Sequence, residues 1–296
     1  MPRFTLWHSV DTRSLRALWA FKEMGLRRGQ DYALNILAFP PRQHQPGYLQ
    51  HNPLGTVPWF VHREAQDHAP RATMSESCAI PQCTGFDINS DHVVGMCQPC
   101  TSPHAPFAMS YLVMQKPDPC ARNSMSTLPK SCLLIYCRYV AELVRSPLAM
   151  RLGADPDYPA YLNWLAHADA TLTFPQAVVM RYAIYEPGRA RNAADDYAKW
   201  FVARLRLLNA ALADGRPFLC GDRFSLADVC ITYALFNASE HGLCGGGLLA
   251  QGERPLCDRY KPQTHEYLER MMQRTAWHDA QREQSEEGHS AGGATV

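Results

Sequence analysis

Two short stretches of this sequence hold residues whose types and spacing suit ligand recognition. Val57-Pro58 follows a turn that begins at Asn52 and precedes an apolar, strand-like run. Because proline has no N–H to donate to a neighbouring strand, we expect the chain to bend at Pro58. The Val57-Pro58 bond is a candidate cis peptide bond. The N–H and C=O of Val57 would then be available to an extended ligand. Glu76-Ser77 then begins a helix, where a carboxylate, a hydroxyl and first-turn N–H groups gather. A pairing edge beside a helix N-terminus suits a short, charged peptide.

These two motifs, in this order, resemble the glutathione-binding half of the cytosolic glutathione S-transferases. The first runs from Asn52 to Pro58, and the second reads Glu-Ser-x-Ala-Ile from Glu76. The resemblance covers most of residues 4–82 and 139–280. It implies an α+β, thioredoxin-like N-terminal domain followed by an all-α helical-bundle domain, with glutathione as co-substrate, no metal and a role in detoxification.

The resemblance also assigns roles in glutathione binding. It implies that Val57 pairs its backbone with the cysteinyl part of glutathione and that the bond before Pro58 is cis. Glu76 would take the ammonium of the γ-glutamyl end, and Ser77 its carboxylate. A solvated helix start without a ligand is the alternative interpretation of Glu76-Ser77.

Glutathione chemistry needs a thiolate, which the family stabilises with a hydroxyl or thiol after the first strand. A free thiol has a pKa of about 8.5, and nearby donors or a helix N-terminus lower it. The loop here holds no Tyr or Cys, and it resembles the Asp-Ser-Arg-Ser-x-Arg loop of some fungal and bacterial transferases, with Thr12 at the first Ser position. Thr12 is therefore the candidate catalytic donor, with Ser14 and Ser9 as alternatives. Capping of the first helix is the other role open to Thr12 or Ser14, and the carboxylate of Asp11 opposes ionisation of the thiol.

A hydrophobic electrophile would bind on the helical domain of such a protein. Tyr161, Trp164 and His167 are candidates for that site. Aromatic residues at helical spacing are also typical of a packed core, so burial is the alternative interpretation of all three.

Composition and charge exclude other classes of function. The 296 residues carry 29 basic and 28 acidic side chains, which gives no basic surface for nucleic acid. No run of 18 apolar residues predicts a membrane span, and the strand-like start lacks the long apolar region of a signal peptide. We therefore expect a cytoplasmic protein with no nucleic-acid or membrane partner.

Alternating and helical patterns predict the order βαβαββα in residues 1–82. Strands are expected at 4–8, 32–38, 59–62 and 71–74, with the first helix starting at Ser14. Residues 139–280 are predicted to be helical, with a capping box at Ser225 and Asp228 that starts one helix. The charged and then Gly/Ala/Ser-rich residues 281–296 are predicted to be a disordered tail.

Residues 83–138 break this pattern as an irregular insertion within a helix. Six of the 11 cysteines fall in this segment, together with clusters of Pro, Ser and Met. Without it, Gln82 joins Tyr139 in one continuous helical pattern. We interpret the segment as a translated intron. The codons of Gln82-Cys83 can contain a GT splice donor, and the codon of Arg138 can contain an AG splice acceptor. Removal of the segment also keeps the reading frame. A genuine, lineage-specific insertion is the alternative.

One motif within this insertion has the spacing of metal ligands. Cys97-x-x-Cys100, with His92 and His104 nearby, has part of a zinc-knuckle pattern. A second Cys pair at the usual spacing is missing, so we predict no metal site.

The leading hypothesis is an enzyme that transfers glutathione to small hydrophobic electrophiles. The alternative is a protein of the same fold that binds glutathione or hydrophobic ligands without efficient turnover. Three features favour this alternative: Thr12 stands where the family loop has Ser, Asp11 lies next to it, and the insertion interrupts a helix. A dithiol oxidoreductase is disfavoured because no CxxC follows the first strand. The resemblance further implies a homodimer, with the interrupted helix near its interface.

Overall fold

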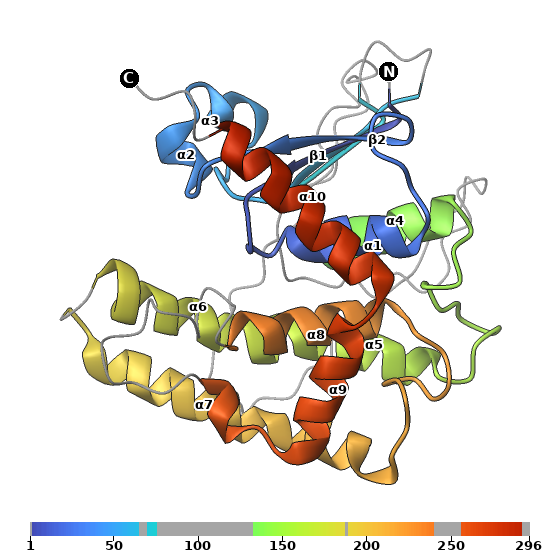
Figure 1. Cartoon of the computed structure of the whole chain (residues 1–296), viewed down its shortest axis with the longest axis vertical. Coiled ribbons are helices and arrows are strands. Elements are labelled where there is room, and N and C mark those ends of the chain that lie inside the picture. The colour runs from blue at the N-terminus through green and yellow to red at the C-terminus, as the bar shows by residue number, and fades with distance from the viewer. Residues whose placement is uncertain (1, 65–69, 76–132, 187–188, 240–255, 292–296) are drawn as a thin grey trace, which may run out of the picture. The chain divides into compact units, whose positions relative to one another are not determined.

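In the computed structural model, the described residues are 2–64, 70–75, 133–186, 189–239 and 256–291. All of them fall within one compact unit (Figure 1). Glu76 and Ser77 lie outside the described residues, as do Cys97-x-x-Cys100 and most of the segment 83–138.

The N-terminal domain is built on a four-stranded mixed sheet in the order β2-β1-β3-β4. Its strands are β1 (Phe4–His8), β2 (Tyr32–Ile36), β3 (Trp59–His62) and β4 (Ala72–Ser75). β1 pairs parallel with β2 and antiparallel with β3, which in turn pairs antiparallel with β4. The helix α1 (Leu15–Glu23) connects β1 to β2, and the short helices α2 (Pro41–His44) and α3 (Tyr48–His51) lie between β2 and β3. The predicted thioredoxin-like order is confirmed.

The rest of the described chain is helical. Its α-helices are α4 (Leu133–Leu143), α5 (Tyr158–Ala166), α6 (Phe174–Met180), α7 (Arg191–Ala211), α8 (Leu226–Asn237), α9 (Pro262–Met272) and α10 (Thr275–Ala291). Two π-helical segments, η1 (His167–Thr173) and η2 (Arg181–Tyr185), continue α5 and α6, and two 3₁₀ segments, η3 (Leu212–Asp214) and η4 (Leu256–Arg259), follow α7 and precede α9. In the part of the chain that the structure describes, none of the helices has the length and apolar character of a membrane span.

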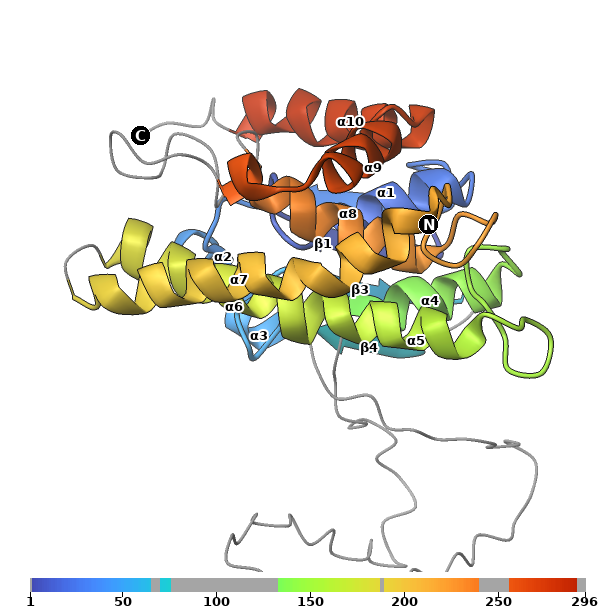
Figure 2. The ribbon, with the colours of Figure 1, turned by 90° about the horizontal axis from the view of Figure 1, so that it is seen from below.

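Helix α8 is the centre of the helical domain, and every residue in it is buried. The predicted capping box is present, because Ser225 Oγ accepts from Ala227 N–H while the N–H of Ser225 donates to Asp228. α8 packs against α1, α5 and α9, as Figures 1 and 2 show. It therefore joins the helical domain to the helix that begins after β1.

The predicted boundary of the irregular insertion 83–138 differs from the structure at its C-terminal end. α4 begins at Leu133, so the last six residues of that segment are helical and continuous with Tyr139. The reason is packing, since Tyr136 and Cys137 are buried in the core. The residues that precede Tyr139 in the sequence thus form the start of α4.

The predicted disordered tail at 281–296 is wrong as far as residue 291. α10 runs to Ala291 along α1 (Figure 1). Glu283 and Gln284 are both buried, although their residue types predict exposure. Glu283 accepts from the Tyr32 hydroxyl and pairs with Lys22, so polar partners on the N-terminal domain hold this helix in place.

Candidate functional site

A cavity of about 240 Å³ lies between the end of the sheet and the helical domain. The N-terminal domain contributes the loop after β1, the start of α2 with the residues before it, and the loop between α3 and β3. The helical domain contributes residues from η1, α6, η2 and α8. The cavity is thus formed by segments that are far apart in the sequence.

The loop that precedes β3 supplies one wall. The Val57-Pro58 bond is cis, as predicted, and Val57 is a buried residue that lines the cavity. Among the described residues, its N–H and C=O have no hydrogen-bond partner. Asn52 holds the loop, because its side chain accepts from Leu54 N–H and donates to the carbonyl of Thr56.

Gly55 is required in this loop for two reasons. Its φ is +64°, in the left-handed region that favours glycine. A Cβ there would also lie only 2.8 Å from the side chains of both Arg42 and Leu49. The turn predicted at Asn52 therefore owes its shape to two residues of the motif Asn-Pro-Leu-Gly-Thr-Val-Pro.

The three candidate hydroxyls after β1 do not share one environment. Thr12 lines the cavity, whereas Ser9 and Ser14 are fully buried. Thr12 Oγ1 lies 2.7 Å from the carbonyl oxygen of Ser9 and 2.7 Å from Ser14 Oγ. Thr12 is thus the candidate that the structure places at the cavity.

Ser14 occupies the N-cap position of α1 without capping it through its side chain. Its hydroxyl is instead 2.7 Å from Nδ1 of His8, the last residue of β1. Burial lowers the pKa of His8 from 6.5 to about 4, so this imidazole is neutral at pH 7. The sequence gives no sign that His8 belongs to the site, since an inward-facing residue in a short strand is normally part of the core.

Asp11 is turned away from the cavity and toward α10. Its carboxylate accepts from Gln284 Nε2 at 2.7 Å, and its carbonyl accepts from the Tyr233 hydroxyl at 3.3 Å. Burial raises the pKa of Asp11, and Asp11 is not among the cavity residues. We predicted that the carboxylate of Asp11 would oppose ionisation of the thiol. This effect is weakened, because the carboxylate faces α10 instead of the cavity and accepts a hydrogen bond from Gln284.

The helical wall of the cavity is not the one that the sequence suggested. Ala177 and Met180 of α6, together with Tyr233 of α8, supply its apolar surface. Tyr161 and Trp164 are buried in the core and His167 packs edge-on against Trp164, and none of the three lines the cavity. The interpretation of these residues as a substrate site is corrected: Tyr161 and Trp164 belong to the core, and His167 packs beside it.

Three arginines line the cavity, and sequence patterns did not identify them. They are Arg13, Arg42 and Arg181. Arg181 is 3.1 Å from Glu186, so its charge is partly neutralised, whereas Arg42 forms no ion pair with the described residues. A positively charged rim with an apolar floor suits a ligand that carries carboxylates and a less polar group.

A buried ion pair fixes the loop and α1 against the helical domain. Arg16 Nη1 lies 2.6 Å from Asp169 Oδ1, and both side chains are buried. The Arg16 guanidinium also lies over the ring of Tyr233, 5.1 Å from its centroid. Because Tyr233 lines the cavity, the ion pair contributes to the position of the cavity wall.

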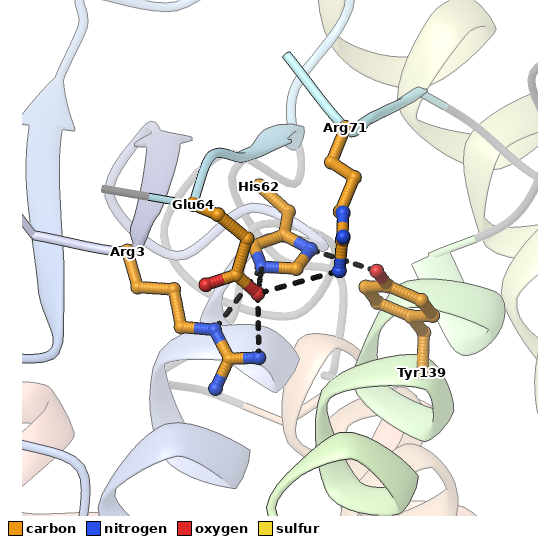
Figure 3. Close-up of polar contacts among 5 residues, drawn as sticks. All are labelled: Arg3, His62, Glu64, Arg71 and Tyr139. Carbon is orange, nitrogen blue, oxygen red and sulfur yellow. Dashed lines mark hydrogen bonds and ion pairs between the residues drawn. The ribbon is translucent and has the colours of Figure 1, made fainter. Parts of the chain in front are cut away.

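A second polar cluster lies at the other end of the sheet (Figure 3). Glu64 accepts from Arg3 at 2.9 Å and is 3.7 Å from Arg71. His62, fully buried in β3, places Nε2 3.1 Å from Glu64 and Nδ1 2.7 Å from the Tyr139 hydroxyl. Burial and the charge of Arg3 lower the pKa of His62. The cluster joins α4 to the sheet and is not part of the cavity.

Comparison with known proteins supports the architecture. Residues 191–270 match the family model described as "Glutathione S-transferase, C-terminal domain". No curated protein matches the sequence.

Solved structures of similar fold cover almost the whole chain. The glutathione transferase URE2P8 from Phanerochaete chrysosporium, solved with oxidized glutathione, is 12% identical with a TM-score of 0.62, and 98% of each chain is covered. A glutathione transferase from Methylococcus capsulatus is 16% identical with a TM-score of 0.59, covering 95% of this chain and 98% of that one. The theta class enzyme from Xanthomonas axonopodis pv. citri, with glutathione bound, is 18% identical with a TM-score of 0.56, covering 95% and 97%. The recognised resemblance and the fold class are confirmed.

Proposed function

We propose that this chain is a glutathione transferase acting on small hydrophobic electrophiles. The match of residues 191–270 to the model of a glutathione S-transferase C-terminal domain supports this proposal. One observation carries the proposal. The backbone edge at cis-bonded Val57-Pro58 and the hydroxyl-bearing Thr12 line the same cavity, whose opposite wall is the apolar surface of Ala177 and Met180. A peptide thiol and a hydrophobic partner would meet there.

Glutathione would bind as an extended peptide against the loop that precedes β3. The N–H and C=O of Val57, which have no partner among the described residues, fit the cysteinyl backbone in the manner of an added strand. Arg42 at the rim suits the glycyl carboxylate. The γ-glutamyl end would be taken by Glu76 and Ser77, which follow β4 in the sequence.

The reaction requires the thiolate of glutathione, which attacks the electrophilic carbon and displaces its leaving group. Thr12 would hydrogen-bond to this sulfur. Each unit by which the thiol pKa falls is worth about 1.4 kcal/mol of preference for the anion. Met180 and Tyr233 line the cavity and would exclude water from one side of the sulfur, which would strengthen its electrostatic stabilisation.

A binding protein without efficient turnover is the second candidate. The favouring observation is that both close partners of the Thr12 hydroxyl, the Ser9 carbonyl and Ser14 Oγ, lie within the protein and compete for its proton. A hydroxyl whose proton is committed in this way does not stabilise a thiolate.

Turnover of an aryl halide with glutathione distinguishes the two functions. We expect Thr12→Ala to lower kcat/KM by about tenfold to a hundredfold, which corresponds to about 1.4–2.7 kcal/mol. Thr173→Ala is the matched control, because Thr173 also lines the cavity while its hydroxyl donates to the Ala168 carbonyl. Retention of the chain on a glutathione resin without turnover would support the binding protein instead. If the unaltered chain neither binds the resin nor turns over the substrate, both proposed functions are contradicted.

We also propose that the protein is a cytoplasmic homodimer, as is typical of this architecture. Light scattering of the full chain after size exclusion tests this assembly. A monomeric mass at micromolar concentration would contradict it.

A further inference from the structure

A buried chain of hydrogen bonds leads from the cavity into the protein. Thr12 Oγ1 lies 2.7 Å from Ser14 Oγ, and Ser14 Oγ lies 2.7 Å from His8 Nδ1. Thr12 lines the cavity, whereas Ser14 and His8 are fully buried. The imidazole is thus connected to the cavity through two hydroxyl groups.

Gln284 of α10 determines which nitrogen of His8 carries the proton. The N–H of Asp11 donates to Gln284 Oε1 at 3.1 Å, and Gln284 Nε2 donates to the Asp11 carboxylate at 2.7 Å. A backbone N–H needs an acceptor and a carboxylate needs a donor, so this amide has one orientation. The same Oε1 lies 3.0 Å from His8 Nε2. The proton of the neutral imidazole is therefore on Nε2.

The direction of the remaining hydrogen bonds follows from this tautomer. With Nε2 protonated, His8 Nδ1 is an acceptor, and the Ser14 hydroxyl donates to it. Ser14 Oγ then accepts from Thr12, whose hydroxyl proton is shared with the Ser9 carbonyl oxygen, also 2.7 Å away. The protons of both hydroxyls point away from the cavity, and Thr12 presents an oxygen lone pair there. Such an oxygen accepts a hydrogen bond from a thiol, but it does not donate one to a thiolate.

We propose that this chain of hydrogen bonds deprotonates the glutathione thiol, with His8 Nδ1 as the final proton acceptor and Gln284 as the residue that holds Nδ1 unprotonated beforehand. The inference rests on the proposed function. It extends that function by assigning residues that never touch the substrate.

The step moves one proton at each position and leaves the hydroxyls intact. The S–H bond breaks and its proton goes to Thr12 Oγ1, while Thr12 gives its own proton to Ser14 Oγ and Ser14 gives its own to His8 Nδ1. The products are a thiolate in the cavity and an imidazolium in the protein. Both hydroxyls now point outward, so Thr12 donates to the sulfur anion that it helped to form.

The charges around His8 determine whether this transfer is favourable. A thiolate in the cavity favours the imidazolium by charge attraction, which opposes the lowering of the His8 pKa by burial. Two carboxylates adjoin Gln284: Asp11 is its hydrogen-bond partner, and Glu283 precedes it in α10. Asp11 is bonded to Gln284, and Glu283 to Lys22 and Tyr32. Neither takes a proton from His8 directly, so His8 Nε2 keeps its hydrogen bond to the neutral amide.

His8, Ser14 and Gln284 are positioning residues, because they act on the sulfur only through Thr12. Nitrogen-15 NMR of the His8 ring in the full chain measures their effect directly. We expect the free protein to show a neutral, Nε2-protonated ring at pH 7. Saturation with glutathione should convert His8 to the imidazolium. A ring that stays neutral in the saturated complex would overturn the proposal, whatever the activity of the protein.

Variants with a matched control provide the second measurement. His8→Asn keeps an acceptor for Ser14 but removes the basic nitrogen. We expect kcat/KM for an aryl halide to fall about a hundredfold, with the KM for glutathione changed less than twofold. The pH midpoint of thiolate formation in the complex, measured by ultraviolet absorbance, should rise by at least one unit. His62→Asn is the control, because His62 is equally buried in the sheet but its hydrogen bonds lead to Tyr139 and Glu64 instead of to the cavity.

Gln284→Met tests the control of the tautomer. It has a similar volume but removes both the acceptor of His8 Nε2–H and the bonds to Asp11. We expect the free protein to show a mixture of His8 tautomers, and kcat/KM to fall about tenfold. An unchanged thiolate midpoint in both His8→Asn and Gln284→Met would overturn the proposal while leaving the proposed function intact. Calorimetry that detects no glutathione binding to the unaltered chain would overturn both.

Discussion

The ring of Tyr136 stacks on the ring of Phe60, with centroids 5.1 Å apart and an angle of 9° between their planes. Tyr136 precedes Tyr139 by three positions in α4. Removal of residues 83–138 would bring Ile80 to the same distance before Tyr139. The contact with Phe60 would then be made by an aliphatic side chain in the same helical register.

This register leads to a prediction for a chain that lacks residues 83–138. We expect it to fold with a melting temperature equal to or above that of the full chain, because Ile80 fills the place of Tyr136 and Ser77 falls in the first turn of α4. Binding to a glutathione resin should be at least as strong as that of the full chain. Thermal unfolding and resin retention measure the two effects.

A second deletion, of residues 83–132 only, is the matched control. It keeps the whole of α4 but places Ser77 six positions further from Tyr139. We expect it to fold but to bind glutathione more weakly than the longer deletion. Equal binding by both, or aggregation of the longer deletion alone, would contradict the register argument. Deep transcript reads that never join the Gln82 codon to the Tyr139 codon would separately exclude the intron interpretation.

The buried ion pair of Arg16 and Asp169 predicts a large cost for removing one partner. Asp169→Ala leaves the guanidinium buried without its carboxylate, and we expect the free energy of unfolding to fall by about 3–5 kcal/mol. Urea unfolding measures the loss. The double variant Arg16→Met with Asp169→Leu should recover most of it, because neither charge remains. A single variant that loses less than 1 kcal/mol would show that water reaches the guanidinium.

The lowered pKa of His8 predicts how stability depends on pH. The folded value is about 4, below the ordinary value of 6.5. The unfolded chain therefore binds a proton more readily as pH falls from 6.5 toward 4, and the folded state loses about 3 kcal/mol across this window. The contribution of neutral His8 to the free energy of unfolding is therefore fully present above pH 6.5 and is lost as the pH falls toward 4.

Urea unfolding at pH 7, 5.5 and 4.5 tests this sign. We expect the free energy of unfolding to change less with pH in His8→Asn, because Asn has no titratable side chain. His62 and His167 also have a lowered pKa, so part of the slope should remain. An unchanged slope in His8→Asn would mean that His8 is accessible to protons in the folded state.

The second polar cluster predicts an effect on stability alone. Tyr139→Phe leaves Nδ1 of the buried His62 without its partner at 2.7 Å, and we expect a loss of about 1–3 kcal/mol. Glutathione binding should change less than twofold, since the cluster is not part of the cavity. Tyr158→Phe is the control, because its hydroxyl accepts from the partly exposed Arg138. A loss of binding that exceeds the loss of stability would link this cluster to the site.

Local patterns predicted much of the fold. The alternation in residues 4–8 matches β1 from end to end, with Phe4, Leu6 and His8 buried. The capping box at Ser225 and the bend at Pro58 were also predictable, because both depend on neighbouring residues. Such features need no knowledge of distant contacts.

The parts that failed depend on contacts between distant residues. Gln284 and His8 are far apart in the sequence, and nothing in their surroundings predicts that they meet. The same contact explains why a charged C-terminal segment forms a helix, since the polar residues of α10 find polar partners on β1, β2 and α1. Periodicity likewise could not distinguish core from cavity for Tyr161 and Trp164.

The contact between α10 and the loop after β1 has a consequence for biosynthesis. Among the strands and helices that the structure describes, the ribosome releases β1 first and α10 last. Until α10 docks, nothing in the described chain sets the tautomer of His8. A nascent chain could thus form its sheet and even capture a ligand while its thiol-activating groups were still unordered. Synthesis that stops before Gln284 would yield a protein that looks folded but is chemically idle.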